Sequence, residues 1–283
     1  MKLMYELAIK LIDIYILISS LFNKKLKRIY EGRKDTFKYI DENIDIQKKN
    51  ILIHVSSVGE FEQAKPIIDG LRSLNKFEII VSFFSSSLEN KVKEDKSVHH
   101  SFYLPSDSKK NMELLLEKIN PVILLLIKYE YWRNLILSTN KKSIPIISVS
   151  SIFRKSQFYV PLYSYFFINT LKKINLFLVQ NNDSVNLLKK NNITRVKKVG
   201  DTRFDRVLKI YNDSKKYPLV EQFKKNKKTV MIGSSWKSDI DKLKNEILRD
   251  LTDTKYIIVP HEINDYNIKY IENIFINDTI KYS

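Results

Sequence analysis

The sequence predicts an α/β protein built on a doubly wound parallel sheet. Short apolar runs rich in β-forming residues alternate with helix-length segments along most of the 283 residues. Some of the intervening segments, such as 111–119 and 184–190, carry Leu, Ile and Lys at helical spacing. With 43% hydrophobic residues, the chain is long enough for one large or two ordinary domains.

The expected strands fall into two groups. After a polar stretch over residues 31–50, seven strands are predicted at 51–55, 77–84, 100–104, 121–127, 144–149, 176–180 and 196–199. A polar region at 210–228 interrupts the rhythm, which restarts with strands at 229–232 and 256–259 and a helix near 239–249. We therefore expect an N-terminal helix within residues 1–30, a first α/β domain over 31–212 and a shorter second α/β domain over 213–283.

The composition limits the classes of partner and cofactor. The net charge is +17, which favours anionic partners such as nucleic acid, acidic lipid headgroups or phosphorylated substrates. The basic residues are scattered apart from clusters at 24–28 and 224–228, so a compositional bias toward Lys, Ile and Asn explains the charge equally well. Because cysteine is absent and only four His are present, we expect no disulfide framework and no metal centre, which fits a reducing compartment.

Residues 1–24 predict an amphipathic helix. Three charges in its first half argue against a membrane-spanning helix or a signal peptide. The charged residues Lys2, Glu6, Lys10 and Asp13 share one helical face. Another face is apolar and contains Leu3, Leu7, Leu11, Ile14, Ile18 and Leu21. This face either lies in a membrane interface, with the basic cluster at 24–28 on anionic headgroups, or packs on the protein's own core.

The ends of the predicted strands supply the candidate binding and catalytic residues, because open parallel sheets bind ligands outside the carboxyl ends of their strands. Glu60 follows the strand at 51–55 directly after Gly59, which allows a close backbone approach. Glu130 leaves a very apolar strand, and pairing with Lys128 is its structural alternative. For Glu60 the alternative is a favourable place in the first turn of a helix. Residues 233–235, Gly-Ser-Ser, read as a short phosphate-type turn.

Several segments together resemble the 3-deoxy-D-manno-octulosonic acid (Kdo) transferases of lipid A biosynthesis. Residues 55–60, Val-Ser-Ser-Val-Gly-Glu, resemble that family's "SVGE" segment, and residues 130–134 resemble its "E-L-W-P-N" segment. Residues 200–205 resemble "G-N-x-K-F-D". Residues 233–236 and 259–261 resemble the phosphate turn and the "P-R-H" segment of the family's second domain. The order of these motifs matches over nearly the whole chain.

The resemblance implies a GT-B glycosyltransferase with two Rossmann-like domains. Such enzymes transfer Kdo from CMP-Kdo to the lipid A precursor (lipid IVA) with inversion, at the cytoplasmic face of the inner membrane. The resemblance assigns Glu60 as the general base and implies no metal, no cofactor and no nucleic-acid partner. It places Ser56, Ser57, Gly59, Glu130 and Arg154 on the acceptor side, and Arg203, Gly233, Ser234 and His261 on the donor side.

Three departures from the family pattern bear on these expectations. Lys128 stands where many relatives carry an acidic residue, and residues 150–156 around Arg154 match the family's loop only loosely. The sequence ends before the family's Gly-Gly-His-Asn-Pro-Leu-Glu segment, which predicts an incomplete donor domain. Two alternatives therefore accompany the enzyme: a non-catalytic membrane-associated binding module, and one half of a split transferase completed by a second chain.

Overall fold

The computed structural model describes residues 1–158, 161–213, 217–251, 254–276 and 279–281. The chain divides into two compact units, Met1–Asn212 and Asp213–Ser283.

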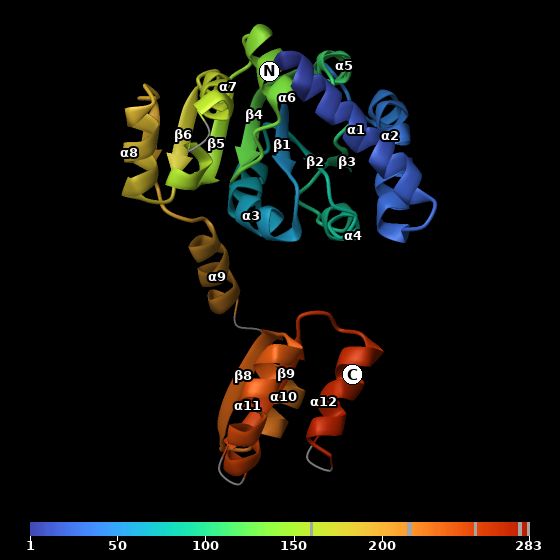
Figure 1. Cartoon of the computed structure of the whole chain (residues 1–283), viewed down its shortest axis with the longest axis vertical. Helices are drawn as coiled ribbons and strands as arrows, with labels where there is room; N and C mark the ends of the chain where they lie inside the picture. The colour runs from blue at the N-terminus through green and yellow to red at the C-terminus, as the bar shows by residue number, and fades with distance from the viewer. Residues whose placement is uncertain (159–160, 214–216, 252–253, 277–278, 282–283) are drawn as a thin grey trace. The chain divides into compact units, whose positions relative to one another are not determined.

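A seven-stranded parallel sheet forms the centre of the first unit (Figure 1). Its strands lie in the order β3-β2-β1-β4-β5-β6-β7, so the direction of winding reverses between β1 and β4. This arrangement confirms the predicted doubly wound sheet. The strands are β1 (Asn50–Val55), β2 (Glu78–Phe83), β3 (His100–Tyr103), β4 (Pro121–Ile127), β5 (Ile146–Ser151), β6 (Leu176–Val179) and β7 (Val196–Lys198).

Helices cover both faces of this sheet. Along β4, Leu124 and Leu126 belong to one buried cluster and Leu125 and Ile127 to the other, because successive strand residues point to opposite faces. The helices are α1 (Lys2–Ser20), α2 (Lys24–Asn43), α3 (Val58–Ser73), α4 (Glu89–Lys93), α5 (Lys109–Ile119), α6 (Arg133–Lys141), α7 (Pro161–Leu171), α8 (Asn182–Lys190) and α9 (Arg203–Asn212). A 3₁₀ turn, η1, spans Lys155–Phe158.

The polar stretch expected at residues 31–50 contains most of α2, for which the sequence analysis assigned no element. Ile29 and Ile40 are buried on one side of α2. Ile29 and Ile40 are three helical turns apart, so the apolar stripe of α2 is narrow. Charged residues therefore dominate the sequence pattern of this helix.

Gly32 in α2 is required by packing. A Cβ added there would lie 2.1 Å from Cδ2 of Tyr103, whose ring packs on Phe83 with centroids 4.5 Å apart. We expect Gly32→Ala to lower the free energy of unfolding by about 1–3 kcal/mol, because the buried ring has to shift. Urea denaturation measures this change.

Gly70 in α3 provides the matched control, since an added Cβ meets nothing within 4 Å there. Gly70→Ala is expected to raise the free energy of unfolding by about 0.5–1 kcal/mol through helix propensity. Equal effects of the two substitutions would contradict the close contact between α2 and Tyr103.

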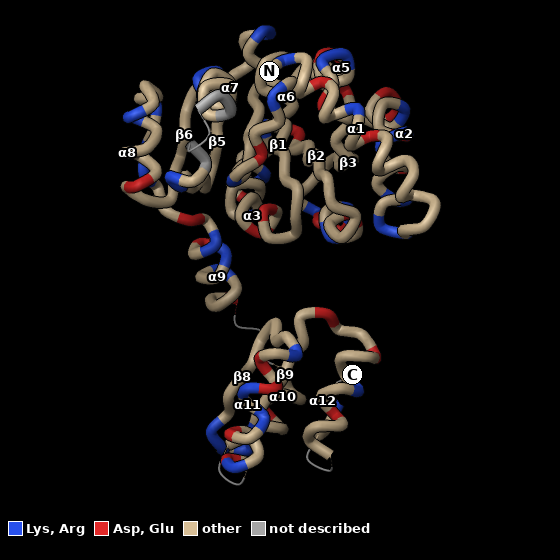
Figure 2. Tube along the Cα trace, in the orientation of Figure 1, with Lys and Arg blue, Asp and Glu red and all other residues tan. Residues whose placement is uncertain are grey.

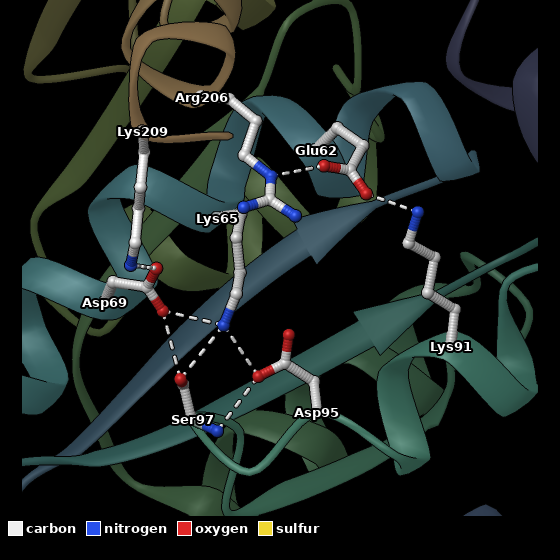
Figure 3. Close-up of polar contacts among 8 residues, drawn as sticks. All are labelled: Glu62, Lys65, Asp69, Lys91, Asp95, Ser97, Arg206 and Lys209. Atoms are coloured by element: carbon white, nitrogen blue, oxygen red, sulfur yellow. Dashed lines mark hydrogen bonds and ion pairs between the residues drawn. The ribbon is translucent and has the colours of Figure 1, made fainter. Parts of the chain in front are cut away.

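Helix α9, which ends the first unit, is anchored to α3 by ion pairs (Figure 3). Arg206 Nε donates to Glu62 Oε2 at 2.6 Å, and Lys209 Nζ donates to Asp69 Oδ2 at 2.8 Å. Asp69 also pairs with Lys65, whose Nζ lies 2.7 Å from Asp95 Oδ1. Polar contacts rather than apolar burial therefore hold α9, in which no described residue is buried.

The second unit has a small core of its own. Its parallel strands β8 (Lys228–Ser235) and β9 (Thr254–Pro260) pair with each other. The helices are α10 (Pro218–Lys224), α11 (Lys237–Asp250) and α12 (Asp265–Ile274), and the buried residues of the core cluster are Ile240, Ile247 and Phe275. The turn expected at 233–235 is instead the end of β8, where the pairing shifts register between Gly233 and Ser235.

Helix α1 packs on the rest of the first unit with the side that carries Tyr5, Glu6 and Asp13. Tyr5 Oη donates to Asp107 Oδ2 at 2.6 Å, and Asn134 Nδ2 donates to Glu6 Oε1 at 2.9 Å. Asp13 accepts from Arg33 and from Ser106. The side chains of the predicted apolar face are exposed: Leu3, Leu7, Leu11, Ile14, Ile18 and Leu21. The inward side also carries the buried Ile9 and Ile16, whereas Lys2 and Lys10 of the predicted charged face are exposed.

Two further observations concern membranes and charge. Within the described residues, no helix combines the length and the apolar character needed to cross a bilayer. Lys and Arg are spread over helices of both units rather than gathered on one element (Figure 2).

Candidate active site

The two strand-exit glutamates lie at the point where the sheet reverses its winding. Glu60 follows β1 and Glu130 follows β4, and these two strands are neighbours. In doubly wound sheets the crevice at this switch point is the usual ligand site. The strand order therefore brings together two carboxylates that are seventy residues apart in the sequence.

Glu60 occupies the first turn of α3, as its structural alternative predicted, and its side chain turns back toward the strand. Ser57 caps the helix and accepts a hydrogen bond from the Glu60 backbone N–H at 3.3 Å. Glu60 Oε2 in turn accepts from the Ser56 backbone N–H at 2.7 Å. The carboxylate is therefore held by the turn between β1 and α3 and is largely buried.

Ser56 joins the two glutamates. Its Oγ donates to Glu130 Oε2, while its backbone N–H donates to Glu60. Glu130 Oε2 also accepts from Trp132 Nε1 at 2.8 Å and lies 3.4 Å from Nε2 of His54. No ion pair between Glu130 and Lys128 is present among the described residues, so the pairing considered for Glu130 is replaced by these contacts.

His54 lies on β1 with no exposed surface. Its Nδ1 is 3.1 Å from the Ser82 carbonyl oxygen and 3.0 Å from Ser82 Oγ. Its Nε2 faces Glu130, so any form of the ring with hydrogen on Nε2 attracts that carboxylate. His54 is thus a buried positioning residue for Glu130.

The environments of the two glutamates shift their pKa values in opposite directions. Burial and the nearby charge of Glu130 raise the pKa of Glu60 above its ordinary value, although the Ser56 N–H, His54 and Lys128 oppose the shift. Burial also acts to raise the pKa of Glu130, but His54, Ser56 and Trp132 outweigh it and lower that pKa. Glu60 therefore binds a proton more strongly than an ordinary glutamate, and Glu130 binds one less strongly.

The other residues predicted for the acceptor side have weaker structural support. Gly59 is the second residue of α3, and the nearest atom to an added Cβ is Ser57 Oγ at 4.0 Å. Neither a positive φ nor local packing requires glycine there, and the close backbone approach at Gly59 stays a prediction. Arg154 is exposed between β5 and η1, and no contact with either glutamate is recorded for it among the described residues.

Arg203 begins α9, and its guanidinium is occupied by Asp201. Arg203 Nε donates to Asp201 Oδ2 at 2.8 Å, and Gln63 on α3 donates to Asp201 Oδ1 at 3.0 Å. Thr202 Oγ1 donates to the Gln63 carbonyl at 2.7 Å. Because Gln63 lies one helical turn beyond Glu60, the segment 201–203 is fixed on the same helix as the candidate base.

The donor-side candidates Gly233, Ser234 and His261 lie together within the second unit. Ser234 has a left-handed backbone with φ of 55° at the end of β8, and His261 directly follows β9. The His261 N–H donates to the Ser235 carbonyl at 2.9 Å, and its ring stacks on Trp236 with centroids 4.2 Å apart. The two strand ends thus form one small rim beside the start of α11.

Two residues of the site were not proposed from the sequence. His54 is a polar residue inside an otherwise apolar strand, and that interruption was the available signal. Trp132 stands within a segment already compared with the family, yet its hydrogen bond to Glu130 depends on the turn after β4.

Comparison with known proteins identifies a family. The family described as 3-deoxy-D-manno-octulosonic-acid transferase (kdotransferase) matches residues 28–206. A bifunctional glycosyltransferase/methyltransferase of Fusobacterium nucleatum is 27% identical over 94% of this chain and 40% of its own length. A 3-deoxy-D-manno-octulosonic acid transferase of Aquifex aeolicus is 23% identical over 80% of this chain and 59% of its own length. The chain therefore spans about half the length of these curated relatives.

Solved structures agree on the fold. A UDP-GlcNAc 2-epimerase from Neisseria meningitidis, bound to UDP-GlcNAc, has a TM-score of 0.58 at 16% identity, covering 80% of this chain and 68% of that one. The epimerase of Methanocaldococcus jannaschii has a TM-score of 0.55 at 15% identity, covering 81% and 69%. These likenesses support the Rossmann-like, GT-B type architecture predicted for the chain. The family match over residues 28–206 covers more than half of the chain and shows that the chain belongs to the Kdo transferase family of glycosyltransferases.

Proposed function

We propose that this protein transfers Kdo from CMP-Kdo to a hydroxyl group of the lipid A precursor, lipid IVA, with inversion at the anomeric carbon. The observation that carries the proposal is the pair Glu60 and Glu130, joined through Ser56 at the switch point of the sheet. Family membership supplies the reaction class.

In the proposed mechanism Glu60 is the general base. Its carboxylate removes the proton of the acceptor hydroxyl as that oxygen attacks the anomeric carbon, and the bond from this carbon to the CMP phosphate oxygen breaks. The raised pKa of Glu60 makes it a stronger base than an ordinary glutamate. Glu130 stays charged and, with Ser56, holds Glu60 in place.

The departing CMP carries a negative charge that the protein has to stabilise. We assign this role to Arg203 and to the rim of Gly233, Ser234 and His261, and we place the acceptor beside Ser57 and Arg154. This chain spans 40% and 59% of the length of two curated relatives. That it binds the donor by itself is therefore part of the proposal. A second chain that completes the donor side is the alternative to test beside it.

The proposed location is the cytoplasmic face of the inner membrane. Helix α1 supports it, because its polar side is hydrogen-bonded to the first unit and its apolar side is exposed. An exposed apolar stripe next to the basic cluster at 24–28 is typical of an interfacial helix on anionic lipid.

The test is a transfer assay with the purified chain, labelled CMP-Kdo and lipid IVA in detergent micelles, read by mass spectrometry of the lipid. Label on the lipid supports the proposal. If calorimetry detects donor binding without transfer, or detects no donor binding and no transfer occurs, the binding module is favoured. Adding a candidate second chain to the assay then tests the split enzyme.

The pH profile of kcat/KM reports the state of Glu60. Since the base must be deprotonated and its pKa is raised, activity should fall on acidification at a pH above the ordinary glutamate pKa of about 4.3. Glu130→Gln removes the negative charge beside Glu60, so the acid limb of the profile should move to lower pH. This shift is expected even if the substitution changes the maximal rate.

The control for this profile is Glu117→Gln, which removes the same charge from an exposed position on α5. Its acid limb should coincide with that of the unchanged protein. An acid limb that stays in place in Glu130→Gln would contradict the electrostatic coupling of the two carboxylates.

A further inference from the structure

Arg133, at the start of α6, has a guanidinium that the fold only partly satisfies. Its Nε and Nη1 are buried, and neither has a hydrogen-bond partner among the described residues. Its Cζ lies 4.6 Å from the ring centroid of Phe166, a contact that compensates one face of the group but none of its N–H donors.

A pocket of about 340 Å³ opens beside Arg133. Its wall combines apolar and aromatic side chains with two cations: Leu137, Tyr165 and Phe166 together with Arg133 and Lys173. No carboxylate of the described residues forms an ion pair with Arg133. The volume is at the lower end of the range of small-molecule sites.

The pocket adjoins the first turn of α1. Met1 lines the pocket, and the backbone N–H of Arg133 donates to Tyr5 Oη at 3.2 Å. The rings of Tyr5 and Phe166 have centroids 6.0 Å apart. The apolar side chains of that turn, Leu3 and Met4, are exposed. A ligand in this pocket would therefore meet the half-buried Arg133 and the exposed Lys173, with an apolar helix face beside it.

We propose that this pocket binds the headgroup of an anionic phospholipid, with Arg133 and Lys173 on the phosphate and the start of the acyl chains against Leu137 and Phe166. A guanidinium presents paired N–H donors that match phosphate oxygens, and Arg133 lines the pocket together with a second cation, Lys173. The apolar wall selects a lipid over a free phosphate ion. This site is separate from the transfer reaction and rests on the proposed function only for its membrane location.

The test uses dihexanoylphosphatidylglycerol below its micelle concentration, titrated into the full chain by calorimetry. Because neither a bilayer nor sugar transfer is involved, failure here is distinguishable from failure of the proposed function. We expect binding at least about tenfold tighter than that of glycerol 3-phosphate. Equal affinity for the two would mean a free-anion site and would overturn the proposal.

Arg133→Met should weaken lipid binding by at least about tenfold, since it removes the charge-assisted hydrogen bonds and keeps the apolar stem. Lys142→Met, an exposed charge beyond the other end of α6, is the matched control and should leave affinity within about twofold. Asn169→Trp fills the pocket from an exposed position on α7 and keeps Arg133, so it decides the question if Arg133→Met fails to fold. Unchanged affinity in either pocket variant rejects the site.

Discussion

Glu60→Gln is expected to lower the rate of Kdo transfer by about 10²–10⁴-fold, the usual contribution of a positioned general base. The amide is nearly isosteric, and its oxygen can still accept from the Ser56 N–H. The helix start keeps its Ser57 cap, so the fold should be retained. The measurement is the single-turnover rate at saturating donor and acceptor.

Glu117→Gln serves as the control here as well, because it makes the same chemical change on an exposed part of α5. Its rate should match that of the unchanged protein. If Glu60→Gln retained near-normal transfer, the base would have to be another group, and Glu130 would be the first to examine.

The paired substitution Leu7→Glu and Leu11→Glu on α1 should release the protein from vesicles that contain anionic lipid. Both side chains are more than half exposed, so the fold loses little. Burying one leucine in the acyl region stabilises association by about 1.5–3 kcal/mol, so losing two and adding two negative charges should weaken binding by about 10²-fold or more. Vesicle sedimentation measures the change.

The matched control is Leu74→Glu, an exposed leucine that follows α3. It should leave vesicle binding unchanged. These substitutions are a sharper test than deleting residues 1–28, because deletion also removes Tyr5 from Asp107 and Asp13 from Arg33. Full vesicle binding by the paired variant would show that α1 does not contact the bilayer.

The coupling of α1 to the site loop gives membrane contact a structural consequence. Asp107, which accepts from Tyr5, also accepts from the backbone N–H groups of Asn134 and Leu135, and burial raises its pKa to about 6. Asn134 lies four residues after Glu130. The helix proposed to touch lipid and the first turn of α6, which follows the Glu130 loop, are therefore held by one buried carboxylate.

The strands and the rim residues could be predicted from the sequence, because both depend on local patterns. Each of the nine predicted strands corresponds to an observed one with its ends shifted by at most three residues, since apolar runs bounded by polar turns are read directly from neighbouring residues. Placing Glu60 and Glu130 at strand ends needed no more than that. The helix α2 was missed because its buried stripe is narrow within a charged segment.

Contacts between segments that are distant in the sequence could be seen only in the tertiary structure. Only the strand order makes β1 and β4 neighbours at the switch point, so only it joins Glu60 and Glu130 through Ser56 and sets His54 against Glu130. The charged face and the apolar face of α1 could be read from its sequence. The sequence did not show which of the two faces packs on the protein. Tyr5 donates to Asp107 and Glu6 accepts from Asn134, both more than a hundred positions away, and these hydrogen bonds fix that side of α1 inward, because a buried carboxylate such as Asp107 has to be paired.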